Sequence, residues 1–119
     1  MKKLFMLIAI FTAMDSVAGG AYIANGTTIT AIFPRNGTQD MFIIETSGGT
    51  GICAGKRIYF PLSVSLVENG SSAAHNRTYS ALLTAFASGN KVTIHNPIDG
   101  DSDQSNIACG KAADIIITK

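Results

Sequence analysis

One segment with apolar residues at helical spacing lies between several runs in which apolar and polar residues alternate as in β-strands. This arrangement limits the folds that the chain can adopt. Apolar side chains recur in it at helical spacing, at Tyr79, Leu82, Leu83, Phe86 and Ala87. The spacing predicts a helix that begins near Ala73, and Gly89 after it supplies a left-handed stop. Ser71 or Ser72 can cap its first turn by accepting a hydrogen bond from a free amide.

Short runs rich in Ile, Val, Thr and Phe flank this helix, and turn residues separate them. They cover residues 22–33, 41–46, 56–66, 91–96 and 115–117. In the third run, alternate residues predict one half-buried strand whose inward side chains are Ile58, Phe60, Leu62, Val64 and Leu66. Pro61 places that strand at a sheet edge or at a bulge, because proline cannot donate to the ladder.

The element order is therefore three strands, one helix and two strands. This order predicts a mainly β domain with one helix, a five-stranded OB-fold-like Greek-key barrel formed by residues 19–119. A closed barrel would also remove the exposed sheet edges that invite aggregation. The alternative is an open α+β sheet with the helix on one face.

Residues 1–18 have the form of a secretory signal peptide. Met1 and two lysines are followed by an apolar run from Leu4 to Phe11 and by a small-residue exit at Ala18. We therefore expect a secreted or periplasmic protein. The apolar run is shorter than the roughly 20 residues that span a bilayer, and no later stretch reaches that length, so we expect no membrane span.

The charges of residues 19–119 balance. The chain has nine Lys and Arg and eight Asp and Glu, and removal of Lys2, Lys3 and Asp15 with the leader leaves seven of each sign. Because phosphate binding needs an excess of positive charge, this balance argues against a nucleic-acid partner.

Cys53 and Cys109 are the only cysteines of the chain. In an exported domain of this size, an even pair predicts a disulfide bond. The alternative is a cysteine nucleophile assisted by His75 or His95, which would need a thiolate of low pKa beside the imidazole.

A polar strip with one aromatic residue lies on the outward face of the predicted third strand. Its members, the candidate ligand-binding residues, are Arg57, Tyr59, Ser63 and Ser65. OB-folds usually bind oligonucleotides or oligosaccharides beside this strand. A ring face together with hydroxyl groups suits a sugar, whereas the alternative is an ordinary solvated surface.

The signals for metal binding and for catalysis are weak. Asp99, Asp101 and Asp103 alternate like the start of a calcium loop, but Gln104 replaces the turn glycine and Gly110 replaces the closing glutamate. The two histidines lack the spacing of a zinc site. No nucleophile elbow or carboxylate pair is recognisable, so we expect no enzyme and no cofactor.

The segment from Tyr79 to Asn96, YSALLTAFASGNKVTIHN, resembles the helix, glycine turn and fourth strand of the B subunits of pertussis-like AB5 toxins. It also resembles small secreted bacterial proteins of unassigned role. The toxin resemblance implies a secreted OB-fold with a cysteine pair, a homo-oligomeric ring such as a pentamer, binding of host glycans and an enzymatic A subunit as partner. No motif in the first two strands matches, so no glycan-binding residue is transferred.

These observations lead to two functional expectations. The first is an exported, non-catalytic module that binds carbohydrate, a host glycan, in the manner of a toxin B subunit. The second is a periplasmic or secreted protein-interaction or structural protein with no sugar site.

Overall fold

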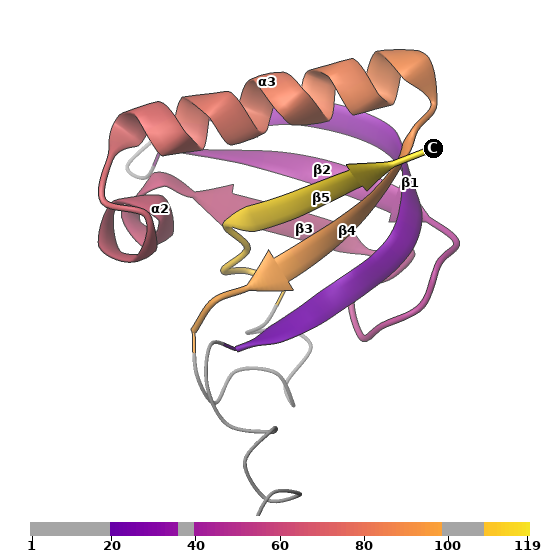
Figure 1. Ribbon diagram of the computed structural model, residues 1–119, viewed down its shortest axis with the longest axis horizontal. Coiled ribbons are helices and arrows are strands. Elements are labelled where there is room, and N and C mark those ends of the chain that lie inside the picture. Colours follow the sequence, from indigo (N-terminus) through magenta and orange to yellow (C-terminus); the bar gives the residue numbers. More distant parts are fainter. Residues whose placement is uncertain (1–19, 36–39, 99–108) are drawn as a thin grey trace, which may run out of the picture.

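A computed structural model describes residues 20–35, 40–98 and 109–119. Within these ranges the chain has an α+β architecture, a five-stranded antiparallel sheet with two helices (Figure 1). The elements are β1 (Ala21–Arg35), β2 (Met41–Ser47), β3 (Arg57–Pro61), α2 (Leu62–Glu68), α3 (Ser72–Ser88), β4 (Lys91–Asn96) and β5 (Asp114–Thr118). The predicted signal peptide, the Asn36-Gly37 turn and the acidic loop lie outside the described residues.

The strands follow the order β3-β2-β1-β4-β5. β1 is 15 residues long. Its first half pairs with β4 and its second half with β2, which confirms the predicted hairpin of the first two strands. The register shifts between Ala24 and Thr27 and between Ile29 and Ala31. Such bulges bend a strand, and the sheet curls around the bent β1 (Figure 1).

The sheet is open, so the predicted closed barrel is wrong and the open α+β alternative is right. β3 and β5 are its two edges. On the side away from β2, Tyr59 of β3 bonds to the segment before β5: its amide donates to Cys109 O at 2.7 Å, and its carbonyl accepts from Ala112 N at 3.0 Å. Both partners precede β5, and β3 ends at Pro61, so the two edge strands do not run along each other.

The predicted third strand is wrong beyond Pro61, where α2 begins. Pro61 has no amide hydrogen, which ends the ladder, and its extended backbone serves as the N-cap of the helix. Leu62 N then donates to Asp40 O at 2.9 Å. The alternation over residues 62–66 does not mark a strand face, because only Ser65 of α2 is buried.

α3 begins and ends as predicted. Ser71 Oγ accepts from Ala74 N at 3.2 Å, and Gly89 has a left-handed φ of 75°. The buried face differs from the predicted stripe, because α3 packs through His75, Leu82 and Ala85, whereas Leu83 and Phe86 are exposed. α3 covers the curled sheet on one side (Figure 1), over a core that includes Ile23, Ile44, Ile58, Phe60, Leu82, Val92 and Ile94.

Candidate functional site

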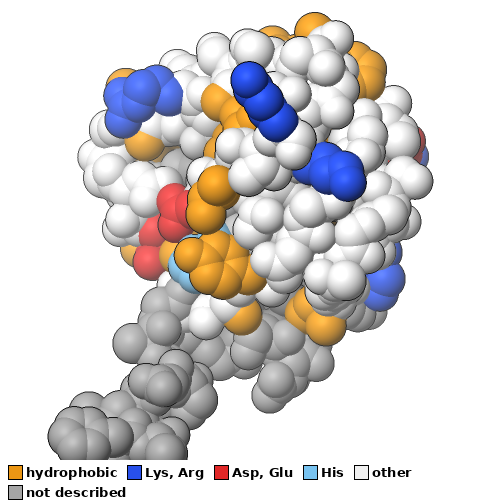
Figure 2. Space-filling model, turned by 45° about the vertical axis from the view of Figure 1, so that its right-hand side comes forward, with side chains coloured by type: hydrophobic (Ala, Val, Ile, Leu, Met, Phe, Trp, Pro, Cys, Tyr) orange, Lys and Arg blue, Asp and Glu red, His pale blue; other side chains and the backbone are white. Residues whose placement is uncertain are grey.

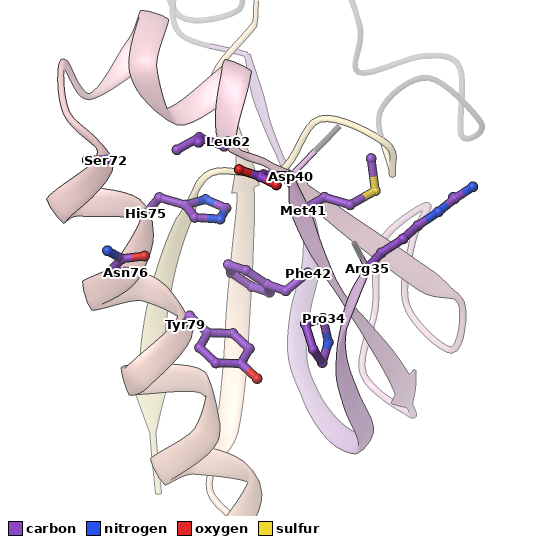
Figure 3. Close-up of a pocket in the computed structure, with 10 residues that line it drawn as sticks. All are labelled: Pro34, Arg35, Asp40, Met41, Phe42, Leu62, Ser72, His75, Asn76 and Tyr79. Atoms are coloured by element: carbon purple, nitrogen blue, oxygen red, sulfur yellow. The ribbon is translucent and has the colours of Figure 1, made fainter. Parts of the chain in front are cut away.

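A groove of about 450 Å³ lies between α3 and the end of the β1–β2 hairpin at which β1 stops and β2 starts (Figure 3). α3 forms one wall, the last residues of β1 and the first of β2 form the other, and α2 begins at one end. The lining residues are Pro34, Arg35, Asp40, Met41, Phe42, Leu62, Ser72, His75, Asn76 and Tyr79. A concave site with apolar walls and a few polar groups is where ligands commonly bind.

Aromatic rings form the floor of the groove. Phe42 is 3% exposed and stacks on Phe60 of β3, with ring centroids 4.7 Å apart. Its other neighbours are His75 and Tyr79 of α3, each with a centroid 4.9 Å away. Residues four apart share one face of a helix, so the two α3 rings face Phe42 together (Figure 3).

His75 joins the floor to the junction of α2 and α3. Its ring is buried, and Nδ1 lies 3.5 Å from Oγ of Ser65, which is itself 1% exposed. Burial lowers the pKa of His75, while the nearby charge of Asp40 acts in the opposite direction. The imidazole is therefore neutral at neutral pH.

Polar side chains form the rim. Asp40, Ser72 and Asn76 are exposed. Asp40 directly precedes β2, and the other two lie in the first turns of α3. The hydrogen bond from Leu62 N to Asp40 O ties the acidic residue to α2. Arg35 lines the groove only in part, because its side chain extends away from α3 (Figure 3). The rim thus offers a carboxylate, an amide and a hydroxyl beside the rings.

The structure does not bring the four predicted ligand-binding residues into one strip. Arg57 and Tyr59 lie in β3, but Ser63 and Ser65 lie in α2, because the strand ends at Pro61. Ser63 is exposed, whereas Ser65 is buried beside the imidazole of α3. The predicted strip is therefore wrong as a single surface.

The side chain of Arg57 already contacts two neighbouring residues of the sheet. Its Nε lies 2.7 Å from Oε2 of Glu45, and its guanidinium stands 5.5 Å from the ring centre of Phe33. The hydrogen bond to Glu45 is the main reason that the pKa of Arg57 is raised. These contacts are typical of a cross-strand pair on a solvated sheet face.

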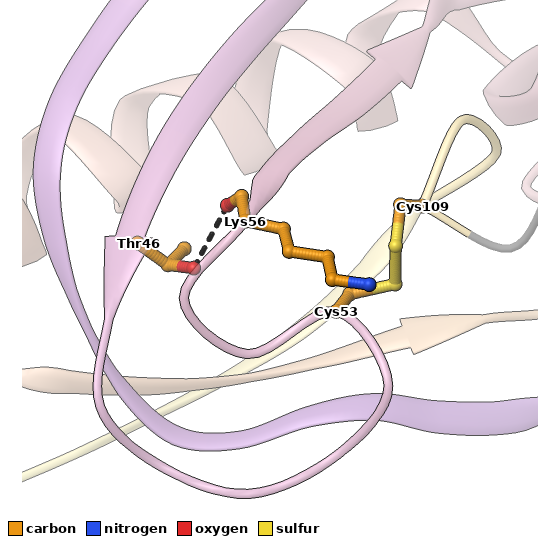
Figure 4. The surroundings of a disulfide bond; sticks show 4 residues. All are labelled: Thr46, Cys53, Lys56 and Cys109. Carbon is orange, nitrogen blue, oxygen red and sulfur yellow. Dashed lines mark hydrogen bonds between the residues drawn. A yellow bond between two sulfur atoms is a disulfide. The ribbon is translucent and has the colours of Figure 1, made fainter. Parts of the chain in front are cut away.

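The predicted disulfide is confirmed, and it excludes the cysteine nucleophile. Cys53 in the β2–β3 loop is bonded to Cys109, and both residues are buried (Figure 4). The same loop is held where Thr46 Oγ1 donates to Lys56 O at 2.9 Å. A disulfide is typical of proteins outside the cytoplasm, so it agrees with an extracytoplasmic location.

The described residues were also compared with the requirements of a metal site and of a membrane-spanning helix. The calcium candidates Asp99, Asp101 and Asp103 lie outside them. In residues 20–35, 40–98 and 109–119, no three His, Cys, Asp or Glu side chains gather as metal ligands. No helix of the same ranges is long and apolar enough to cross a bilayer.

Sequence reasoning missed the groove as a site. The spacing of His75 and Tyr79 on one helix face was a visible signal for two of its residues. The approach of Phe42 to that face depends on how α3 lies across the sheet, which no local pattern specifies.

Comparisons with curated proteins and with solved structures found no match. The resemblance to the toxin B subunits therefore has no support from them. One family model matches residues 2–119, nearly the whole chain, and its description is "Family of unknown function (DUF5992)". The chain therefore belongs to the family of unknown function DUF5992.

Proposed function

We propose that this chain is a secreted or periplasmic, non-catalytic binding module that holds a carbohydrate in the groove beside α3. The observation that carries the proposal is the meeting of aromatic rings with a polar rim in one concavity of about 450 Å³. A pyranose ring has apolar C–H faces and a belt of hydroxyl groups. It therefore needs both kinds of contact within a few ångströms of each other.

The aromatic part of the groove suits the apolar face of a sugar. Tyr79 is half-buried, and its ring lies 4.9 Å from that of Phe42. Phe42 is too deeply buried to contact a ligand with its whole face, so it supports Tyr79 from below. A ring fixed by packing loses little entropy when it binds, which favours it as a contact surface.

The polar part suits the hydroxyl belt. The Asp40 carboxylate accepts hydrogen bonds only, whereas the Asn76 amide can donate and accept. Both side chains are exposed and line the groove. The neutral imidazole of His75 adds a ring nitrogen, Nε2, that the hydrogen bond to Ser65 does not use.

The same geometry favours binding over catalysis. The hydroxyl of Ser65 lies 3.5 Å from the imidazole of His75, but at 1% exposure it is out of reach of a substrate. Among the described residues, Asp40 is the only carboxylate that lines the groove, whereas glycoside hydrolysis uses a pair. The predictions of a homo-oligomeric ring and of an enzymatic A subunit stay predictions, drawn from the resemblance alone.

Titration of the isotope-labelled chain with a panel of soluble mono- and oligosaccharides, followed by NMR, tests the proposal. We expect one class of saccharide to shift the amide signals of Asp40, Phe42 and Asn76. Asn76→Ala and Asp40→Asn should each raise the Kd about tenfold, equivalent to roughly 1.4 kcal/mol. Arg77→Ala is the matched control, because Arg77 is exposed beside Asn76 but does not line the groove.

Two results would contradict the proposal. One is a panel in which no saccharide shifts the groove signals at tens of millimolar. The other is a loss of affinity in Arg77→Ala as large as that in Asn76→Ala, which would place the contact elsewhere on α3. Thermal melting of each variant checks that the fold is unchanged.

A protein-binding function is the second candidate. It is favoured by exposed apolar side chains on the two helices, namely Leu66, Val67, Leu83 and Phe86. Exposed apolar patches commonly mark protein interaction sites. A partner captured by the unaltered chain but not by Leu83→Lys, together with silent saccharide titrations, would favour this candidate.

A further inference from the structure

Three side chains on the outer face of the sheet form a row across three neighbouring strands. Tyr22 of β1 pairs with His95 of β4, and His95 pairs with Asp114 of β5. We call these three residues the outer row. Directly opposed side chains on neighbouring strands lie about 5 Å apart, so the sheet itself fixes their spacing. None of the three lines the groove beside α3.

Contacts within the outer row orient its members. The rings of Tyr22 and His95 have centroids 4.9 Å apart and are tilted by 50°. On the other side of the imidazole, Nδ1 lies 3.3 Å from Oδ2 of Asp114. Nε2 of His95 and Oδ1 of Asp114 make no other hydrogen bond to the described part of the chain. The row therefore keeps polar atoms available.

The outer row is also more exposed than a packing role requires. Tyr22 is 56% exposed, and the Asp114 side chain is 45% exposed. Figure 2 shows hydrophobic, histidine and acidic side chains next to one another on the surface. A large ring that rests on an imidazole and leaves much of its surface to solvent is a platform for a second flat, partly apolar group.

We propose that the outer row is a second carbohydrate contact, in which a pyranose ring stacks on Tyr22 and its hydroxyl groups donate to Asp114. The proposal shares with the proposed function only the class of ligand, because the two sites have no residue in common. His95 is a positioning residue that holds both the tyrosine ring and the carboxylate.

Other ligand classes fit the outer row less well. One imidazole and one carboxylate are fewer than the ligands that protein zinc sites use. A phosphate would meet the negative charge of Asp114 with no lysine or arginine in the row. A sugar hydroxyl, by contrast, donates to a carboxylate without a charge penalty, and hydrogen bonds to ionised acceptors are the stronger ones.

Two contacts on one chain would change how it binds a long glycan. When both engage one polymer, the second contact forms at the effective concentration set by the first. An oligosaccharide long enough to reach both sites, or many chains on a glycan-coated surface, would therefore bind more tightly than a monosaccharide.

The NMR titration that tests the groove can report on the outer row separately. We expect a saccharide to shift the amide signals of Tyr22, His95 and Asp114. Tyr22→Ala should raise the Kd at this site by about tenfold or more, whereas Tyr22→Phe, which keeps the ring, should raise it by less than about threefold. Ile116→Ala is the matched control, because Ile116 is exposed on β5 two residues from Asp114.

The outcomes separate the two proposals. Shifts in the row with a silent groove would support the outer row and refute the groove. Shifts in the groove with a silent row would refute the outer row alone. If Ile116→Ala weakens binding as much as Tyr22→Ala, the face acts as a general apolar surface, and the sugar contact is overturned.

Discussion

The disulfide between Cys53 and Cys109 allows a quantitative test of what stabilises this fold. The two residues are 56 positions apart, so the bond closes more than half of the described chain into one loop. The chain-entropy relation gives about 4 kcal/mol for a loop of this length. Small domains have a total stability of only about 5–15 kcal/mol, so reduction should remove a large share of it.

The measurement is urea unfolding of the oxidised chain, of the reduced chain and of the double variant Cys53→Ala/Cys109→Ala. With a slope of roughly 1–3 kcal/mol per molar urea, the midpoint should fall by roughly 1–4 M on reduction. The melting temperature should fall by roughly 15–30 °C. The reduced chain keeps both sulfur atoms, so its comparison with the oxidised chain isolates the covalent link from the loss of buried volume.

A reduced chain destabilised by less than about 1 kcal/mol would refute the loop-closure reasoning. It would mean that the unfolded chain already holds the two segments together, or that the bond adds strain to the fold. A double variant much less stable than the reduced chain would instead measure the packing of two buried side chains.

Three further predictions concern single positions. Ser71→Ala removes the hydrogen bond at the start of α3 and should cost about 1 kcal/mol in urea unfolding; no change would mean that solvent replaces the cap. Gly51→Ala places a Cβ 2.5 Å from the carbonyl oxygen of Ile23 at a φ of 113°, and should destabilise the chain by roughly 1–3 kcal/mol. In Gly48→Ala the added atom has open space, so an equal loss of stability there would contradict the role of the contact with Ile23. Because burial lowers the pKa of His75 below 6.5, the unfolded chain binds the proton more readily. The contribution of neutral His75 to stability is complete above pH 6.5 and is lost as the pH falls through 6.5 towards the folded pKa. Urea unfolding of His75→Gln between neutral pH and about pH 5 should lack this loss of stability.

Elements with local signals could be predicted from the sequence. The cap at Ser71, the stop at Gly89 and the alternation of Val92 and Ile94 each act within a few residues, and α3 and β4 lie where these signals place them. The pairing of Cys53 with Cys109 followed from the number of cysteines and the expected compartment.

Features that depend on distant segments were predicted wrongly. Alternation from Ile58 to Leu66 fits a strand as well as a strand followed by a short helix, and the chain turns at Pro61 because the ladder ends there. Whether β3 and β5 close a barrel depends on their relative directions in the curled sheet, which no run of residues encodes.

The candidate sites divide in the same way. Arg57 and Tyr59 were correctly placed on one strand, but Ser65 left the predicted surface when the strand became a helix. The groove and the outer row each need residues from three or more elements. Neither could be read from one element alone.

The disulfide and the groove occupy opposite poles of β2. This strand starts at Met41 beside the rings and ends at Ser47, where the loop to Cys53 begins. Its seven residues separate the two ends by roughly 20 Å. Under the proposed function, the disulfide and the ligand contacts thus lie at different ends of one strand. Substitutions in the groove would then leave the disulfide undisturbed, and loss of the disulfide would lower the stability of the fold before it changed the groove.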